Sequence, residues 1–262
     1  MAIARRMAHW AKALKYEDLP CKTVHGAKRR VIDSLATTLG AYHSHPGKIV
    51  REKAMPVSDP KAKATVWGTP HRTLPELAAF ANGAMVRYLD YNHTYLSLEP
   101  AHPSDNFAAA VSIIGSEPEK LRPTSRETAD HSMFYCCAAA LVDGDVTLAT
   151  FDEHRLNDPK LLDLIDRTKI VEDPKLNEGY PEGIHNDVTI TCTDGTKLNK
   201  RVDFPRGHAR NPMTDEEVVA KFHRMAQGVV TDKTAATILD LAWNLDELSD
   251  LTPLFSFEVT AS

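Results

Sequence analysis

The chain has 262 residues, of which 42% are hydrophobic and 26% are charged, and its formal net charge is −5. This composition is typical of a soluble globular protein, and it excludes an intrinsically disordered chain, a collagen-like repeat and a disulfide-rich miniprotein. The length predicts one or two domains. Apolar runs stay well short of the roughly 18 residues that a membrane-spanning helix needs, so we expect no membrane partner.

The cysteines and the basic residues exclude two classes of site. The four cysteines have no metal-binding spacing, and three of them are not clustered in the way that an iron–sulfur cluster requires. We therefore expect reduced thiols in an intracellular compartment. Residues 1–100 carry 15 basic and 8 acidic side chains, but the basic ones are scattered and are not interleaved with aromatic residues. We accordingly expect no nucleic-acid partner.

Helical spacing of apolar residues dominates the first part of the chain. It predicts helices over residues 3–14 and 23–42. The sequence His45-Pro46-Gly47 predicts a polar turn, and residues 63–68 are predicted to be extended. The next helix is predicted over residues 75–90, because proline is favoured in a first helical turn.

The helix predicted over residues 3–14 is basic, and no acidic residue precedes Glu17. We favour a helix that docks on the rest of the protein. The alternative is a mitochondrial targeting helix, although the segment is short for one and poor in serine. We therefore expect a cytoplasmic protein, with the mitochondrial matrix as the alternative location.

The second part of the chain combines helices with one predicted hairpin. Helices are predicted over residues 104–114, 129–142, 158–167, 214–225 and 235–245, and a helical turn over residues 147–154. Val188, Ile190 and Cys192 alternate with polar residues and precede the turn sequence Asp194-Gly195. This pattern predicts a β-hairpin whose second strand ends near Phe204.

Polar and titratable side chains are concentrated in one segment, which runs from Asp90 to Asn106 and reads DYNHTYLSLEPAHPSDN. Asp90 and His102 could supply a general base and a general acid, and the Thr94 hydroxyl could orient a substrate. Ser104 is a candidate N-cap, and the helix N-terminus that it begins would attract a carboxylate.

Two other interpretations of this segment remain open. Asp90 could simply be solvated and His102 could only shape the turn before Pro103, because short polar residues are common in turns. Alternatively, Asp90, His93, His102 and Asp105 could hold a zinc ion. Their spacing matches no compact metal motif, so we expect no metal and no other cofactor.

The sequence of this segment resembles the signature of the MmgE/PrpD family, which includes 2-methylcitrate dehydratase and cis-aconitate decarboxylase. LDYNHTYLSLEPAHPSDN is similar to the family's Asp-aromatic-Asn-Asp-Thr and His-Pro-Ser-Asp-Asn motifs. The resemblance continues in LPCKTVHGAKRRVIDSLATTLGAY, in RPTSRETADHSMFYCCAAALVDGDVTLATF and in GHARNPMTDEEVVAKF, and so covers nearly the whole chain. His93 departs from the family, which usually has Asp there, and this departure weakens the metal interpretation.

The resemblance implies a mainly α fold with a smaller α+β domain. We expect residues 1–117 to form the first part of a helical domain and residues 118–212 to form part of the smaller domain. Residues 213–262 are then expected to return to the helical domain. A charged joint at residues 116–120 motivates the first boundary. We also expect a homodimer.

The resemblance further implies which residues act. Asp90, Thr94 and His102 fall on acid–base and substrate-orienting positions of the family. Tyr135 falls on an active-site tyrosine, although its helical position alone favours a buried aromatic residue. Arg126, His131 and Ser104 are expected to bind substrate; on their spacing alone, Arg126 and His131 could instead form a surface ion pair and a helix cap.

The expected reaction is the metal-independent elimination of water from a hydroxylated tricarboxylate such as 2-methylcitrate. A base removes a proton next to a carboxylate, and an acid protonates the departing hydroxyl. We expect His102 to move the proton, because imidazole titrates near neutral pH. The HPSDN sequence is nearer to the dehydratases than to the decarboxylases, and decarboxylation of a related tricarboxylate is the alternative.

One departure from the family concerns length. Family members carry a large helical stretch, with a further active-site histidine and substrate-binding lysines, between the helix at residues 106–114 and the joint at residues 116–120. In this chain almost no residues separate the predicted helix at residues 106–114 from the joint at residues 116–120. We therefore expect an internal truncation, which makes a non-catalytic family member the second alternative. Helices that lack their partners would then expose apolar faces.

Overall fold

The computed structural model describes residues 3–55, 57, 62–89, 91, 121–180 and 182–260. They belong to two compact units: unit 1 comprises Met1–His93 and Pro212–Ser262, and unit 2 comprises Thr94–Asn211. Helices dominate both units, and each unit has one two-stranded sheet in its described part, which confirms the mainly α class with a smaller α+β part. The boundary expected after residue 117 lies outside the described residues.

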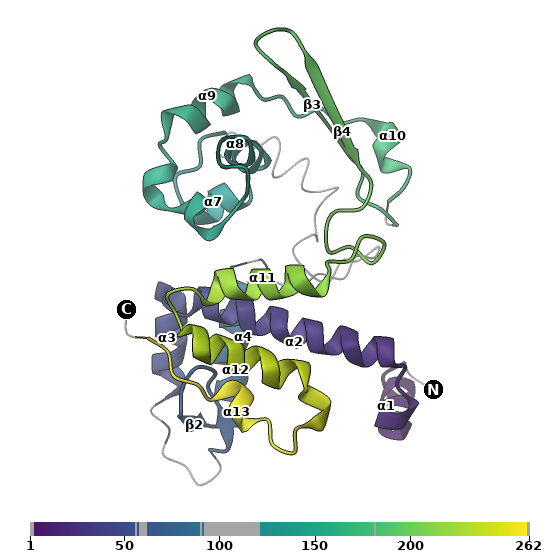
Figure 1. Ribbon diagram of the computed structural model, residues 1–262, viewed down its shortest axis with the longest axis vertical. Helices are drawn as coiled ribbons and strands as arrows, with labels where there is room; N and C mark the ends of the chain where they lie inside the picture. The colour runs from purple at the N-terminus through teal and green to yellow at the C-terminus, as the bar shows by residue number, and fades with distance from the viewer. Residues whose placement is uncertain are drawn as a thin grey trace. The chain divides into compact units, whose positions relative to one another are not determined.

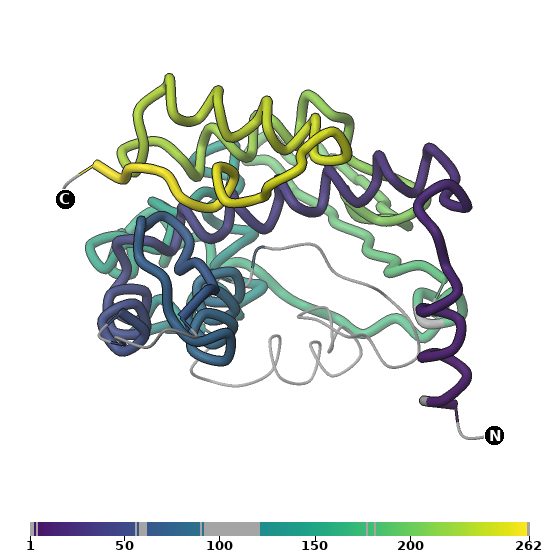
Figure 2. Tube along the Cα trace, turned by 90° about the horizontal axis from the view of Figure 1, so that it is seen from below, coloured from purple at the N-terminus to yellow at the C-terminus, as the bar shows by residue number. Residues whose placement is uncertain are grey.

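Unit 1 is built from helices at both ends of the sequence (Figure 1). Its elements are α1 (Ile3–Ala13), η1 (Tyr16–Asp18), α2 (Cys21–Ala41), α3 (His45–Ala54), β1 (Ala64–Thr65), β2 (Arg72–Thr73), α4 (Pro75–Tyr88), α11 (Asp215–Ala226), α12 (Asp232–Trp243), η4 (Leu245–Glu247) and α13 (Thr252–Phe255). The long helix α2 is central, because it packs against α4, α11 and α12. Figure 2 shows α2 running beside the C-terminal helices, which are far from it in the sequence.

The core of unit 1 follows from the apolar stripe of α2. Ile32, Leu35 and Leu39 recur at helical spacing and are fully buried. Phe222 of α11 and Ile238 of α12 are buried in the same unit. The sequence therefore forms a helical layer in which the C-terminal helices cover α2.

Unit 2 has its own core around α8. Its elements are α7 (Arg126–Asp130), α8 (Met133–Asp143), η2 (Leu148–Phe151), η3 (Glu153–Arg155), α9 (Pro159–Arg167), α10 (Pro174–Asn177), β3 (Asn186–Thr191) and β4 (Lys197–Val202). Tyr135 and Ala138 of α8 pack with Leu161 and Ile165 of α9 in one buried cluster. Gly144, at φ 77°, ends α8 in the left-handed conformation that favours glycine.

The predicted hairpin is confirmed as β3 and β4, which pair antiparallel from Asn186 with Val202 to Thr191 with Lys197. Both strands are largely exposed. Val188 and Leu198 are 47% and 55% exposed, and within the described residues their sheet consists of these two strands. A two-stranded sheet with an open apolar face is marginal by itself.

Two predictions about elements are wrong. The turn predicted at His45-Pro46-Gly47 is the first turn of α3, because Ser44 caps the helix by accepting a hydrogen bond from the Gly47 amide at 3.1 Å. The helix predicted over residues 129–142 is two helices, since α7 ends before His131 and Ser132 caps α8. Within the described part of the chain, none of the helices is long and apolar enough to cross a membrane.

Candidate active site

Most of the predicted catalytic segment lies outside the described residues. This applies to Asp90, Thr94, His102 and Ser104, and also to the other residues of the alternative metal site. The roles assigned to these side chains therefore stay predictions. Tyr91 is the described residue of the segment, and its surroundings show how unit 1 holds the point where the segment begins.

A buried ion pair lies against Tyr91. The Nζ atom of Lys221, on α11, is 2.6 Å from Oδ1 of Asp33 on α2. Lys221 also donates a hydrogen bond of 2.5 Å to the Tyr91 carbonyl oxygen, and its Nζ lies 4.1 Å from the centre of the Tyr91 ring. The side chains of Lys221 and Asp33 are 7% and 9% exposed. The ammonium group thus joins two helices to the backbone at Tyr91.

The sequence interpretation missed this pair, although a signal for it is present. Asp33 directly follows the fully buried Ile32, but it lies about 100° or more around the helix from the apolar stripe of α2. Lys221 lies three residues after Val218 and directly before Phe222, so it belongs to the buried face of α11. Charged residues are almost never fully buried unless they are paired. The buried lysine therefore predicts an acidic partner, without showing on which helix that partner lies.

Tyr135 lies in the core of unit 2. The residue is fully buried, and its hydroxyl donates a hydrogen bond of 2.8 Å to the Thr150 carbonyl oxygen. Burial raises the pKa of the Tyr135 hydroxyl to about 12, and the nearby Arg155 opposes this rise. This environment is that of a buried structural tyrosine, which the helical position of Tyr135 alone favours. The catalytic role implied by the family stays a prediction.

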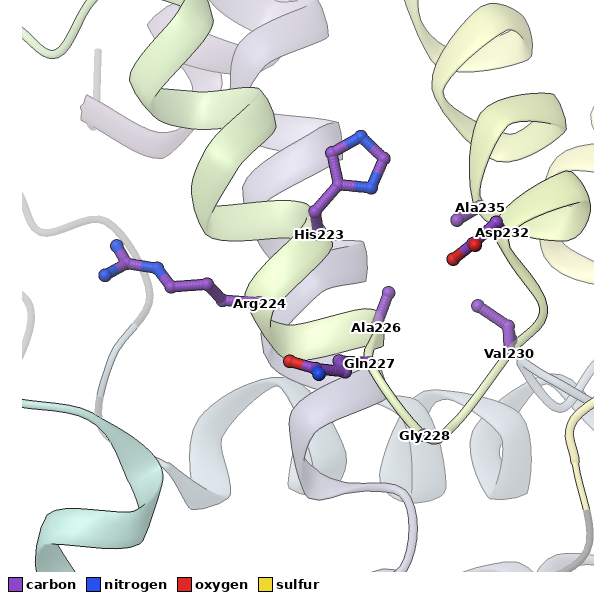
Figure 3. Close-up of a pocket in the computed structure, with 8 residues that line it drawn as sticks. All are labelled: His223, Arg224, Ala226, Gln227, Gly228, Val230, Asp232 and Ala235. Carbon is purple, nitrogen blue, oxygen red and sulfur yellow. The ribbon is translucent and has the colours of Figure 1, made fainter.

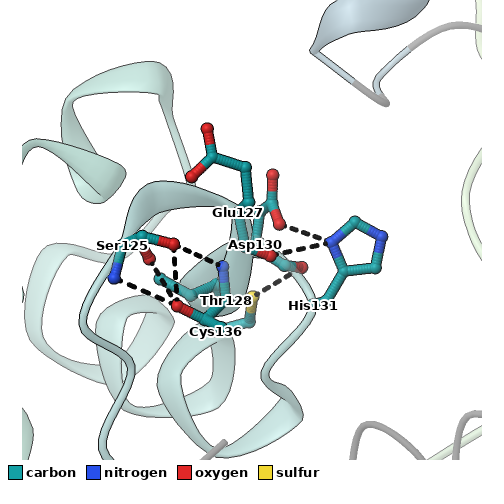
Figure 4. A network of polar contacts seen from close by, with 7 residues as sticks. Ser125, Glu127, Thr128, Asp130, His131 and Cys136 are labelled. Atoms are coloured by element: carbon teal, nitrogen blue, oxygen red, sulfur yellow. Dashed lines mark hydrogen bonds and ion pairs between the residues drawn. The ribbon is translucent and has the colours of Figure 1, made fainter. Parts of the chain in front are cut away.

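Arg126 and His131 belong to α7, at opposite ends of the helix. Arg126 is its first residue and is half-buried, whereas His131 is its exposed C-cap. The Nδ1 atom of His131 lies 2.5 Å from Oδ1 of Asp130 and 3.2 Å from the Glu127 carbonyl oxygen (Figure 4). His131 therefore closes the end of α7 in the way expected of a helix cap. Its predicted contact with substrate, and that of Arg126, remain predictions.

Cys136, close to His131, is held in the same network. Its thiol lies 3.7 Å from the Ala129 carbonyl oxygen and 3.8 Å from that of Asp130, and Figure 4 shows Cys136 beside Asp130 and His131. Burial, together with the smaller effects of Cys137 and Asp130, raises the pKa of the Cys136 thiol to about 12. A thiol with such a pKa is protonated at neutral pH, so this position does not provide a reactive thiolate.

A shallow groove on unit 1 lies between the C-terminal end of α11 and the N-terminal end of α12. It is lined by His223, Arg224, Ala226, Gln227, Gly228, Val230, Asp232 and Ala235. Figure 3 shows His223 facing the groove, whereas Arg224 points away from it. None of the predicted site residues lines this groove. Across the described residues, no three histidine, cysteine, aspartate or glutamate side chains are grouped in a way that could hold a metal ion.

Comparison with known families decides the ancestry of the chain. The MmgE/PrpD N-terminal domain matches residues 5–144, and the MmgE/PrpD C-terminal domain matches residues 105–247. Each match covers more than half of the chain. The chain belongs to the MmgE/PrpD family. Both of the family's domains are represented in it, and the two matched ranges overlap over residues 105–144.

The names of the curated relatives give two different activities. A cis-aconitate decarboxylase of Aspergillus terreus is 30% identical over 185 residues, which are 70% of this chain and 35% of the relative. A cis-aconitate decarboxylase of Mus musculus is 30% identical over 132 residues, or 50% and 27% of the two chains. A 2-methylcitrate dehydratase of Cupriavidus necator is 36% identical over 98 residues, or 35% and 20%. The matched stretches thus span about a third or less of these relatives.

Proposed function

We propose that this MmgE/PrpD chain is a lyase that acts on a small tricarboxylate, and that its first candidate reaction is the elimination of water from 2-methylcitrate. The observation that carries the proposal is the match to both domains of the family, with 2-methylcitrate dehydratase among the relatives. The HPSDN sequence at residues 102–106 is the part of the polar segment that favours the dehydratases.

In the proposed mechanism, His102 and Asp90 divide the two proton transfers. One of them removes the proton next to a substrate carboxylate, and the other protonates the hydroxyl as it leaves. We assign the mobile proton to His102, because an unperturbed imidazole titrates near neutral pH. The Thr94 hydroxyl is proposed to orient the substrate, and the N-terminus of the helix predicted from Ser104 to attract one of its carboxylates. Arg126 and His131 are proposed to bind the other carboxylates.

Decarboxylation of cis-aconitate is the second candidate. It is favoured by coverage, because the match to the Aspergillus terreus cis-aconitate decarboxylase extends over 70% of this chain, against 35% for the Cupriavidus necator dehydratase. The two reactions differ in a measurable product. Elimination from 2-methylcitrate creates a conjugated double bond that absorbs in the ultraviolet, whereas decarboxylation of cis-aconitate releases carbon dioxide.

We also propose that a central portion of the family's fold is absent from this chain. Matches to both domains are contained in 262 residues, although the matched relatives are far longer than the stretches they share with it. The exposed apolar residues of the β3–β4 hairpin are consistent with missing neighbours. The enzyme assay must therefore distinguish an active lyase from a family member without catalytic activity.

The deciding experiment is turnover by the purified chain. We expect 2-methylcitrate to yield ultraviolet absorbance, and we expect His102→Ala to reduce the rate by about 100-fold or more, as for loss of a general acid or base. The matched control is His154→Ala, which removes an exposed histidine in η3 of unit 2 and should leave the rate unchanged. Carbon dioxide release from cis-aconitate, measured in parallel, would favour the decarboxylase. A wild-type chain that unfolds cooperatively but turns over neither compound would contradict both reactions.

A further inference from the structure

We propose that Lys221, held by Asp33, is a positioning residue that fixes the backbone and the ring of Tyr91, a residue of the polar segment. Neither residue belongs to the predicted catalytic set. The inference rests on the proposed function in so far as that segment carries the chemistry. The anchoring itself can be tested without activity.

The geometry places three electron-rich groups around one ammonium. Lys221 Nζ lies 2.6 Å from the Asp33 carboxylate and 2.5 Å from the Tyr91 carbonyl oxygen. The face of the Tyr91 ring, at 4.1 Å, is its third neighbour. An ammonium group has three donors and no acceptor, and a desolvated cation is attracted to an aromatic face. Lys221 thus contacts both the main chain and the side chain of Tyr91.

The energetics favour a positional role over a purely stabilising one. Two charges are taken out of water here, and a buried ion pair can often be replaced by apolar side chains without loss of stability. An apolar pair, however, has no donor for the Tyr91 carbonyl oxygen. That oxygen belongs to the planar peptide unit that joins residues 91 and 92, so its orientation constrains the direction in which the chain continues.

The contact also connects distant parts of the sequence. Lys221 is 130 residues from Tyr91 and 188 residues from Asp33. In the sequence, Asp90 directly precedes Tyr91 and Thr94 follows it by three positions. Helix α11 therefore contacts the chain at Tyr91, next to Asp90 in the sequence, from the C-terminal part of unit 1. Placement of catalytic groups to within about 1 Å can change a rate by about 100-fold.

The test compares Lys221→Met with Lys28→Met in the full chain. Methionine keeps the length of the aliphatic side chain and removes the charge and the donors. Lys28 forms an ion pair with Asp246, so its replacement also breaks a lysine–aspartate pair between α2 and the C-terminal part of unit 1, at a place that does not involve Tyr91. Hydrogen–deuterium exchange is then followed by mass spectrometry in peptides that contain Tyr91 and in peptides from α12.

We expect Lys221→Met to speed exchange in the Tyr91 peptides by about tenfold and to leave the α12 peptides within about twofold of the wild type. Lys28→Met should leave the Tyr91 peptides unchanged. Equal acceleration in α12, or no acceleration at Tyr91, would overturn the inference. Because Lys221→Met leaves the Asp33 carboxylate without its ammonium partner, the double variant Asp33→Asn/Lys221→Met serves if the single variant does not fold, and the same outcomes apply.

Turnover provides a second and separable readout. With an active wild type, Lys221→Met should lower kcat by about 10- to 100-fold with little change in KM, because it misplaces groups without removing them. An unchanged kcat would overturn the positional role. If the wild type is inactive while exchange responds as expected, the proposed function fails and the anchoring of Tyr91 stands.

Discussion

The polar side chains where α2 meets α3 are paired to different degrees. Arg51 donates a hydrogen bond of 2.6 Å to the Tyr42 carbonyl oxygen, and its guanidinium carbon lies 3.6 Å from the centre of the Tyr42 ring. The Tyr42 hydroxyl in turn donates to the Gly68 carbonyl oxygen at 2.9 Å. The Nε2 atom of His43, by contrast, is buried and has no hydrogen-bond partner among the described residues. Protonation of His43 would therefore place a charge next to a buried ring nitrogen that has no hydrogen-bond partner among the described residues.

This arrangement predicts a loss of stability in mildly acidic solution. Burial lowers the pKa of His43 below its ordinary value of 6.5, and the charges of Lys48 and Arg51 lower it further. Above pH 6.5 the imidazole is neutral in the folded and unfolded chains. Below pH 6.5 the unfolded chain binds the proton first, so the free energy of unfolding falls as the pH drops through the folded-state pKa.

Tryptophan fluorescence can follow this loss, because Trp10, Trp67 and Trp243 all belong to unit 1. We expect the denaturation midpoint of the wild type to fall between pH 7 and pH 5, and His43→Phe to reduce that fall. The control His45→Asn replaces an exposed histidine at the start of α3 and should keep the wild-type dependence. An identical acid dependence in the wild type and His43→Phe would count against this account.

At the scale of elements, local signals predicted those helices whose caps and periodicity agree. The capping box Thr214-x-x-Glu217 and the apolar stripe that follows it predicted α11, and both of its hydrogen bonds are present. Helix α3 was missed because Pro46 and Gly47 are typical of turns, and only the Ser44 side chain, which accepts from the Gly47 amide, shows that they begin a helix. A residue pattern could not decide between these two conformations.

The capping box also supports the helix that carries Lys221. Thr214 Oγ1 accepts from the Glu217 amide at 3.3 Å, and a Glu217 carboxylate oxygen accepts from the Thr214 amide at 2.6 Å. We expect Thr214→Ala to lower the free energy of unfolding of unit 1 by about 1 kcal/mol, which is typical for loss of an N-cap. Urea denaturation followed by tryptophan fluorescence measures the change. Thr214→Ser keeps the hydroxyl and should stay close to the wild type; an equal loss in both variants would show that the methyl group matters and not the cap.

The sequence predicted the part of the candidate site that is contiguous along the chain, and it did not predict the part that depends on how helices pack. The polar segment at residues 90–106 was recognised because titratable residues are concentrated in it. The Asp33–Lys221 pair was missed because its members are 188 positions apart, and because helical spacing places Asp33 away from the apolar stripe of α2. Their pairing depends on how α2 and α11 pack, which is a tertiary property that local periodicity does not contain.

At the scale of the whole molecule, apolar surface remains exposed in both units. Ile3, Met7 and Trp10 of α1 are between 64% and 73% exposed, and Val188 and Leu198 are exposed on the hairpin. Such surface agrees with the expectation that helices and strands lack some of their family partners. The expected homodimer stays a prediction, and the decisive property is whether the chain still binds a tricarboxylate.

Substrate binding by the folded chain predicts a shift of its unfolding transition. A ligand that binds only the folded state stabilises it by about 2.7 kcal/mol at a concentration 100 times its Kd. We therefore expect 2-methylcitrate to raise the Tm by several degrees, with a shift that grows with the logarithm of its concentration. The control is sodium acetate at the same ionic strength, which should give a much smaller shift because it offers one carboxylate. His154→Ala should respond like the wild type, whereas equal shifts with 2-methylcitrate and acetate would mean that the chain has no tricarboxylate site.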